Sequence, residues 1–294
     1  MAGWSDILDE LQKQPSNFDI IRRKYLLELS EYTGRNTIAY YSAWLNKKGV
    51  DNIDINDTDM NGYMNAVKGL DTQKGLDLIL HTPGGDPAAA ESIVKYLRSK
   101  FDNDIRVIVP HLAMSAGTMM ACAAKEIIMG KHSSLGPIDP QFSGIPAYNI
   151  KSEFEEAKRD LVEHPENFPY WKIKLQQFPA AFLKTAIDAI ELADLLVKEW
   201  LTSCMFSDEK QIDNDKIGNI VKTLNDHADS KTHGRHFDVV FCKNMGLKII
   251  NMEEDQELQD KILSVHHSYV HTLAATSAVK IIENQEGKCM INHI

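Results

Sequence analysis

Ser115 and the glycine pair Gly84–Gly85 are the residues of this sequence whose types and spacing could carry out acyl transfer. Ser115 lies thirty residues after Gly85, inside a turn of small residues from Ala113 to Gly117. Its hydroxyl can act as a nucleophile. The glycines can bring bare backbone N–H groups against a substrate carbonyl, because no Cβ blocks the approach. One nucleophile and one oxyanion donor are the minimum for acyl transfer.

Two strand–turn–helix patterns are expected to position these residues. The pattern predicts strands at 76–81, 105–110 and 127–129, and helices at 87–100 and 115–125. Strands that alternate with helices form a parallel sheet, and ligands bind at the carboxyl edge of such a sheet. The glycine turn and Ser115 would therefore meet at one edge. The structural alternative for Ser115 is an N-cap, since serine is common immediately before a helix.

Two motifs carry a family resemblance. Thr82-Pro83-Gly84-Gly85 and Ala113-Met114-Ser115-Ala116-Gly117 resemble the paired motifs of the Clp-protease/crotonase-like superfamily. Within it, the sequence most resembles the serine dehydrogenase proteinase family, of the signal peptide peptidase A type. Further matching segments are 128–130, 134–141, 234–237, 245–248 and 280–284. The resemblance covers about residues 70–145, and more weakly 230–286.

The resemblance implies a fold and a set of site residues. The fold would be an α/β, crotonase-like spiral with parallel βα crossovers. Ser115 would be the nucleophile, and the N–H groups of Gly85 and Ala116 would hold the oxyanion. Gly84, Gly117 and Asp139 would support the site. No cofactor is implied, and we expect no dehydrogenase activity, because no GxGxxG motif follows a strand and no lysine motif indicates pyridoxal phosphate.

The general base is the open question of the sequence. Clp relatives use a histidine from the loop that corresponds to Leu135–Gln141, but here Asp139 or Pro140 stands in its place. Signal peptide peptidase relatives use a lysine, which needs a desolvated amine with a lowered pKa. Lys151 is the first candidate, because apolar residues precede it. The other candidates are Lys172 and Lys174, then Lys158, and among histidines His111 and His132.

Three functions remain open. The leading hypothesis is a serine peptidase that cleaves peptide or protein substrates through an acyl-enzyme at Ser115, with a lysine base. The second is a catalytically inactive peptide-binding or scaffold protein, which would hold extended peptides by strand addition. The third is an acyl-CoA enzyme that uses the same oxyanion turn, with Asp86 or Asp139 as its carboxylate base.

Composition excludes several other classes. The net charge of −10 argues against nucleic acid as the main partner. No apolar run approaches the roughly 18 residues that a membrane span needs, and the N-terminus lacks a leader pattern, so we expect a soluble, cytoplasmic protein. Four scattered cysteines predict buried thiols at Cys122 and Cys204 rather than a zinc site. The histidines at 233, 236, 266, 267 and 271 lack a metal-binding motif, so no metal is expected.

The organisation along the chain is predicted as follows. Helical patterns at 4–14 and 19–31 indicate a helical N-terminal extension over residues 1–70, within which 37–45 could be a strand or a short helix. Residues 71–294 would form one α/β domain with a helical insertion at about 146–232. The long apolar helix 178–205 and the N-terminal helices present more apolar surface than one sheet can cover. We therefore expect a homo-oligomer.

Overall fold

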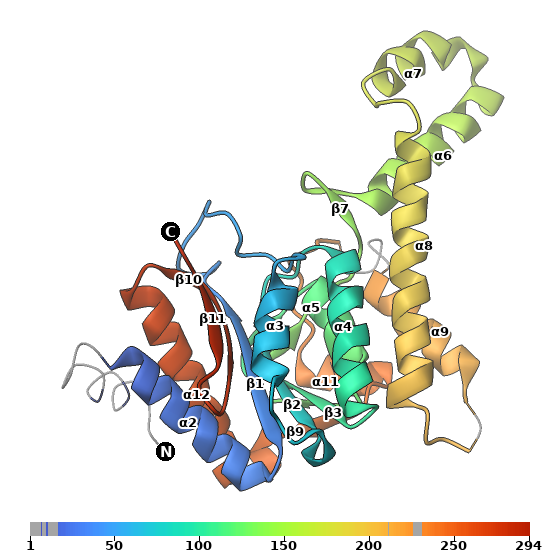
Figure 1. The fold of residues 1–294 in the computed structure, drawn as a ribbon. Helices are drawn as coiled ribbons and strands as arrows, with labels where there is room; N and C mark the ends of the chain where they lie inside the picture. Colours follow the sequence, from blue (N-terminus) through green and yellow to red (C-terminus); the bar gives the residue numbers. More distant parts are fainter. Residues whose placement is uncertain (1–6, 8–9, 11–16, 211, 226–230) are drawn as a thin grey trace.

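A seven-stranded sheet forms the centre of the protein. The computed structural model describes Ile7, Glu10 and residues 17–210, 212–225 and 231–294. The strand order is β11-β10-β1-β2-β3-β5-β9. These strands are β1 (Asn36–Ser42), β2 (Leu76–His81), β3 (Ile105–Val109), β5 (Glu126–Met129), β9 (Ile249–Asn251), β10 (Ala278–Asn284) and β11 (Cys289–His293). Within this sheet the neighbouring strands β1, β2, β3, β5 and β9 run parallel, and β10 and β11 add an antiparallel edge. The α/β class with a mainly parallel sheet is thus confirmed (Figure 1).

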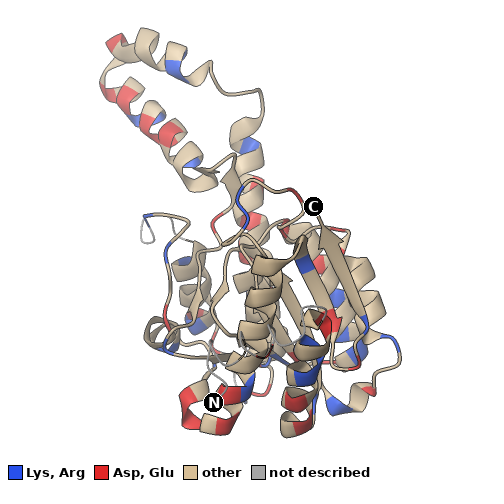
Figure 2. Cartoon of the chain, turned by 90° about the vertical axis from the view of Figure 1, so that its left-hand side faces the viewer, with Lys and Arg blue, Asp and Glu red and all other residues tan. Residues whose placement is uncertain are grey.

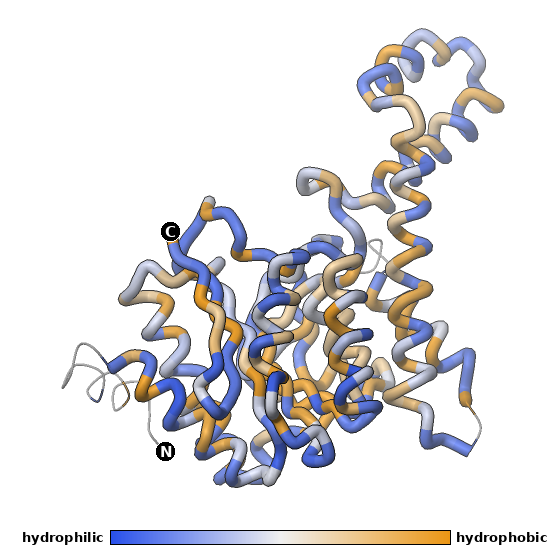
Figure 3. The backbone as a smooth tube through the Cα atoms, in the orientation of Figure 1, coloured by the Kyte–Doolittle hydropathy of each residue, from blue (hydrophilic) through white to orange (hydrophobic). Residues whose placement is uncertain are grey.

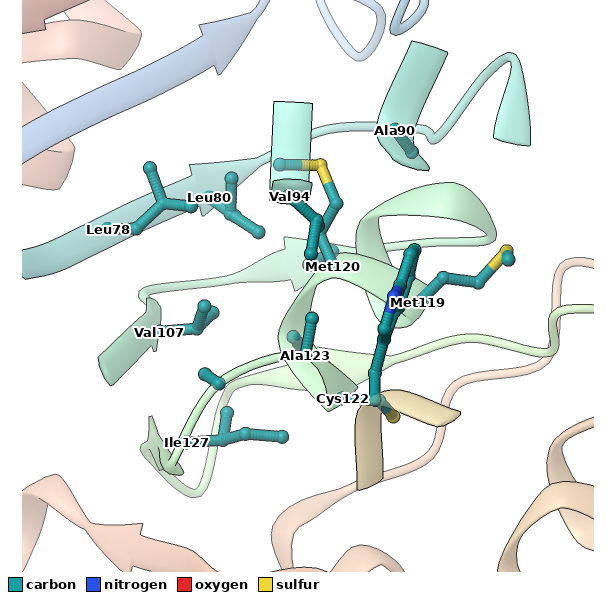
Figure 4. Close-up of a cluster of buried hydrophobic side chains, with 14 of the residues drawn as sticks. Leu78, Leu80, Ala90, Val94, Val107, Met119, Met120, Cys122, Ala123 and Ile127 are labelled. Carbon is teal, nitrogen blue, oxygen red and sulfur yellow. The ribbon is translucent and has the colours of Figure 1, made fainter. Parts of the chain in front are cut away.

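Helices cover both faces of this sheet. On one face lie α3 (Asp59–Val67), α4 (Pro87–Phe101) and α5 (Ala116–Cys122), and on the other α2 (Phe18–Thr33) and α12 (Gln256–Ala275) (Figure 1). All six residues of β2 are buried, as expected for a strand between two helical layers. Figure 4 shows Met120 of α5, and Ala123 directly after this helix, among Leu78, Val107 and Ile127 of the strands. This packing fixes α5, and with it the turn that precedes it, against the sheet.

The two predicted strand–helix units have the expected positions. The strand predicted at 76–81 is β2, and the one predicted at 105–110 ends at Val109. Helix α4 begins directly after Asp86, whose side chain accepts a hydrogen bond of 2.8 Å from the N–H of Ala88. Pro87 occupies the first helical position, where its missing N–H costs nothing. Local sequence therefore determines where this helix begins.

Residues 36–42 differ from the helical extension expected over 1–70. They form β1, which lies between β10 and β2 near the middle of the sheet. All seven of its residues are buried, including Tyr40 and Tyr41. Aromatic and β-branched residues on a surface buried on both faces favour a strand, which resolves the ambiguity of this segment. The helix expected at 19–31 is α2, whereas most of the one expected at 4–14 lies outside the described residues.

A helical arm projects from the body of the protein (Figure 1). It is built from α6 (Ala147–Glu163), α7 (Phe168–Leu175) and the first part of α8 (Phe182–Trp200). A small apolar cluster that includes Ile150 and Ala186 joins α6 to α8. Apolar residues continue along α8 into the body (Figure 3), where Trp200 is buried. None of the described helices is long and apolar enough to cross a membrane.

Shorter elements complete the described chain. After α8 a π-helical turn covers Leu201–Met205, and the next helices are α9 (Asn214–Asn225) and α11 (Val239–Met245). Two small sheets pair β4 (Leu112–Ala113) with β6 (Ser134–Leu135), and β7 (Gln141–Phe142) with β8 (Ile145–Pro146). Single 3-10 turns lie at Thr72–Lys74, Pro165–Asn167 and Met252–Glu254. Cys122 and Cys204 are free and buried, as expected.

A buried ion pair joins α2 to β10. The side chains of Arg22 and Glu283 are both fully buried, with 3.0 Å between Nε and Oε2. Tyr269 of α12 donates a hydrogen bond of 2.9 Å to the same carboxylate oxygen, and Arg23 donates one of 2.8 Å to the other. The carboxylate thus connects both helices of this face to the sheet.

Glu283→Ala should lower the free energy of unfolding by about 3 kcal/mol, because it removes the buried counter-ion of Arg22 and leaves the guanidinium paired with the half-exposed carboxylate of Asp19. Urea denaturation measures this loss. Glu286→Ala is the matched control, since Glu286 pairs only with Lys288 at the exposed end of the hairpin, and it should change stability by less than about 1 kcal/mol. Equal losses in both variants would contradict a special role of the buried pair.

Candidate active site

Ser115 occupies a strained turn between a strand and a helix. Its backbone angles are φ 51° and ψ −119°, outside the regions that residues with a Cβ ordinarily occupy. Backbone hydrogen bonds hold the turn: the Thr82 N–H donates to the Leu112 oxygen at 3.1 Å, and the Met114 N–H donates to the Thr82 oxygen at 3.0 Å. Strain of this kind collects at functional sites, and a serine on a sharp strand-to-helix turn presents its hydroxyl outward. The geometry therefore favours a nucleophile over an ordinary N-cap, and the Ser115 side chain makes no capping hydrogen bond.

The glycine turn lies against Ser115. A Cβ added to Gly84 would come within 2.6 Å of the Ser115 Cβ and 2.9 Å of the Ala116 nitrogen. A Cβ on Gly85 would come within 2.3 Å of the carbonyl oxygen of Ile55. Both positions have positive φ, 99° and 151°, so glycine is needed for the backbone as well as for space. The two motifs, separate in sequence, are in contact.

Two backbone amides at this contact remain available. The Gly84 N–H donates to the Thr82 hydroxyl at 3.1 Å. Among the residues that the structure describes, the N–H groups of Gly85 and Ala116 have no hydrogen-bond partner. They lie on either side of the contact with Ser115, on the cleft described below. Two such amides are what a tetrahedral oxyanion requires.

A loop from the N-terminal part of the chain supports the glycine turn. Ile55 donates its N–H to the Gly84 oxygen, and its own oxygen accepts from the Asp86 N–H, both at 2.8 Å. Buried Lys280 holds this loop through hydrogen bonds to the Asp54 carbonyl oxygen, at 2.6 Å, and to the Asp59 carboxylate, at 2.7 Å. Sequence reasoning did not give Lys280 this role. The sequence signal for a buried, paired lysine was its position within the otherwise apolar first half of β10.

A histidine–aspartate pair stands beside the serine turn. Leu135 and Phe237 form an antiparallel bridge, with hydrogen bonds of 3.0 and 2.8 Å. Following this register brings His233 opposite Asp139, and the two side chains meet at 2.7 Å between Nδ1 and Oδ1. Gln141 donates a hydrogen bond of 2.7 Å to the other oxygen of Asp139. Asp139 is buried, so it fixes the imidazole ring from behind.

Sequence reasoning gave Asp139 a supporting role in the peptidase, or the role of carboxylate base in the acyl-CoA alternative, and gave His233 none. The segment Gly234 to Phe237 did carry part of the family resemblance, and His233 immediately precedes it. That position was the only signal for this histidine, because its partner lies 94 residues earlier in the chain.

One cleft of about 490 Å³ contains these groups. Ser115, Gly85, Ala116 and His233 all line it. The remaining lining residues are Asp54, Pro83, Pro87, Met119, Ile138, Pro140, Gln141, Phe142, Ala189 and Ala193. The cleft is thus mainly apolar, with polar groups gathered at the serine turn. This arrangement suits an extended chain whose carbonyl reaches Ser115.

The lysines expected as bases lie elsewhere. Lys151 lines a different hollow, formed by α6, α8 and α9, and its amine lies 4.0 Å from Glu155. Lys172 and Lys174 belong to α7 in the arm, and Lys158 to α6. The hydrogen bond that Lys174 donates to the Glu153 carboxylate raises the pKa of Lys174, which is the opposite of what a general base needs. The structure therefore does not bring these lysines into the cleft of Ser115.

Three other histidines gather at a second cavity, beside α12. His81, His111 and His266 line a cavity of about 200 Å³ beside α12. Their ring centroids are 5.2–5.8 Å apart. In the described part of the chain, no three His, Cys, Asp or Glu side chains are arranged to hold a metal ion. His111 is thus part of a packed aromatic cluster, and His132 is exposed; neither residue lines the cleft of Ser115.

This cluster should make stability depend on pH. Burial, and then the charge of His111, lower the pKa of His81 from 6.5 to about 3. Burial lowers the pKa of His267 to about 4. Below pH 6.5 these imidazole groups bind protons in the unfolded chain but stay neutral in the folded chain. The free energy of unfolding should therefore decrease as the pH falls from 6.5 toward 3. The slope per histidine is at most about 1.4 kcal/mol per pH unit.

Urea denaturation at several pH values tests this expectation. Between pH 6 and 4, His81→Gln should reduce the change in the free energy of unfolding with pH by at most about 1.4 kcal/mol per pH unit. The reason is that the variant lacks one group that binds a proton in the unfolded chain but not in the folded chain. His164→Gln, at an exposed position in the arm, is the control and should leave the slope unchanged. Identical slopes in wild type and His81→Gln would show that His81 does not contribute.

Comparison with known proteins agrees with this geometry. Residues 46–165 match the family described as ClpP-like SDH-type serine proteinases. Two uncharacterized proteins of Methanocaldococcus jannaschii are similar, one 43% identical over 105 residues and the other 41% identical over 92. The first match covers 36% of each chain and the second 31%, so the similarity spans about a third of the length of these relatives. Gly85, Ser115 and Asp139 lie inside the family match and His233 lies outside it. Residues 46–165 are thus similar to the ClpP-like SDH-type serine proteinases, the family that the motifs around Gly85 and Ser115 predicted.

Proposed function

We propose that this protein is a serine peptidase that forms an acyl-enzyme at Ser115. The observation that carries the proposal is the shared cleft, which is lined by a strained serine, two residues with available amides, and His233, whose ring is held by buried Asp139. In the first step, His233 takes the hydroxyl proton while Ser115 Oγ attacks a peptide carbonyl. The Gly85 and Ala116 amides stabilise the oxyanion. The protonated imidazole then gives its proton to the leaving amine, and water later releases the acyl group.

We propose His233, oriented by Asp139, as the base in preference to Lys151. The reason is position, because His233 lines the cleft of Ser115 and Lys151 lines another hollow. Asp139 contacts Nδ1, which leaves Nε2 for the serine proton. Lys151 remains the alternative from the sequence, and it would need α6 to move toward the cleft.

A fluorophosphonate probe tests the proposal, since it reacts with an activated serine. Wild-type protein should be labelled once, and mass spectrometry of the digest should locate the label on Ser115. Ser115→Ala should not react, whereas Ser143→Ala, in the exposed β7–β8 hairpin, should react like wild type. Absence of label on a folded wild-type protein would contradict the peptidase and favour a peptide-binding role.

We also propose that the protein assembles with copies of itself. The far part of the arm exposes apolar side chains, with Val162 77% and Ile173 67% exposed, and Phe168 and Tyr170 lie beside them. Acidic residues follow the same arm (Figure 2). Apolar surface at the end of a projecting arm supports contact with another subunit. Light scattering should give a mass that is a multiple of 33.2 kDa at micromolar concentration, and a monomer that retains activity would contradict the assembly.

A further inference from the structure

Asp54 is the one carboxylate, among the described residues, that lines the cleft without serving the catalytic pair. It directly precedes Ile55, whose two backbone hydrogen bonds join the loop to the glycine turn. Lys280 holds the Asp54 carbonyl oxygen at 2.6 Å. The backbone of Asp54 is therefore fixed at both sides, close to the oxyanion donor at Gly85.

The carboxylate of Asp54 is not used within the described structure. It has no hydrogen bond or ion pair there, since the contacts of this residue are made by its carbonyl oxygen. The nearest cation, Lys280, is paired with the buried carboxylate of Asp59. No lysine or arginine is among the described residues that line the cleft. The cleft therefore has one negative group on a wall that is mainly apolar away from the serine turn.

We propose that Asp54 determines substrate specificity by binding a cationic group of the peptide next to the scissile bond. The inference rests on the peptidase function proposed above. The cation can be a basic side chain within the peptide or the ammonium group at its N-terminus, because both present N–H donors and a positive charge. Burial raises the pKa of the Asp54 carboxyl, against the effect of Lys280. A cation bound beside it would favour the charged carboxylate.

The test uses four quenched fluorescent peptides of one apolar sequence. The first carries an internal lysine and an acetylated N-terminus, and the second a norleucine and a free N-terminus. The third carries norleucine with an acetylated N-terminus, and the fourth is the first with its lysine acetylated. Wild type should cleave the first or the second roughly tenfold faster in kcat/KM than the third and fourth. The first identifies a basic side chain as the cation, the second an N-terminal ammonium.

Asp54→Asn should remove this preference, so that its kcat/KM values for the cationic and the neutral peptides lie within about twofold of one another. Asp57→Asn is the matched control, on the same loop but outside the cleft, and should keep the preference. The preference should also weaken as salt increases, as expected for a partly exposed charge pair. An equal decrease for all four peptides, or no preference in wild type, would overturn the proposal.

A binding measurement separates this inference from the function on which it rests. Calorimetry on Ser115→Ala should show about tenfold tighter binding of the preferred cationic peptide, and Ser115→Ala with Asp54→Asn should lose that difference. If wild type cleaves no peptide but this difference is present, the peptidase fails and the role of Asp54 stands as binding. If peptides are cleaved and the difference is absent, only the role of Asp54 fails.

Discussion

Ser115→Ala should lower kcat/KM for peptide hydrolysis by at least about two orders of magnitude and leave the fold intact. The hydroxyl is the atom that forms the acyl bond, so its removal leaves only the oxyanion amides and substrate binding to accelerate the reaction. The substitution should leave the surrounding structure unchanged, because the Ser115 side chain makes no capping hydrogen bond to the helix that follows it. Peptide hydrolysis followed by fluorescence, with thermal unfolding beside it, provides both measurements.

Peptide hydrolysis by Ser115→Ala would contradict the proposed role of the serine hydroxyl. If folded Ser115→Ala hydrolyses peptides as wild type does, Ser115 is not the nucleophile. Ser143→Ala serves as the control for the loss of a serine near the cleft, and it should retain full activity.

His233→Ala should lower kcat by roughly 10²- to 10⁴-fold, the range expected when a general base is removed. Asp139→Asn should also lower it strongly, because the carboxylate holds Nδ1 at 2.7 Å and thereby sets the tautomer of the ring. The losses from the two variants should not add, since both disable one unit. Steady-state kinetics of the single and double variants measures this.

Lys151→Met is the decisive comparison for this assignment. We expect it to keep its activity, because Lys151 lies in the hollow beside α9. Loss of activity in Lys151→Met with activity retained in His233→Ala would reject the histidine base and support the lysine mechanism. The amounts of folded protein should be checked by circular dichroism in each case.

The strands and turns around Ser115 could be predicted from local sequence. An apolar run that ends in Pro83-Gly84-Gly85 has few alternatives, since the glycines adopt positive φ and the proline cannot continue a strand in the sheet interior. The same holds for the helix that begins after Asp86. These elements depend on neighbours within a few residues, and the family match over 46–165 covers them.

Residues whose positions depend on distant pairing could not be found in this way. His233 meets Asp139 because Leu135 and Phe237, which lie on either side of the insertion in the sequence, form an antiparallel bridge. Lys151 follows the site closely in sequence, yet α6 leads away from the cleft into the arm. Nearness along the chain was therefore a poor guide to nearness in space. Lys280 shows the same limit, since its partner Asp59 lies 221 residues before it.

The separation of these partners has a consequence for the timing of synthesis. The ribosome releases Ser115 well before His233, and Lys280 emerges near the end of the described chain. A nascent chain can therefore form the serine turn while the residues that would activate and support it are still unmade, because contacts between distant segments form only when both are present. The proposed peptidase would remain inactive until the segments that carry His233 and Lys280 have been made and have folded onto the sheet. The order in which the residues are synthesised would then delay proteolysis until the site has assembled.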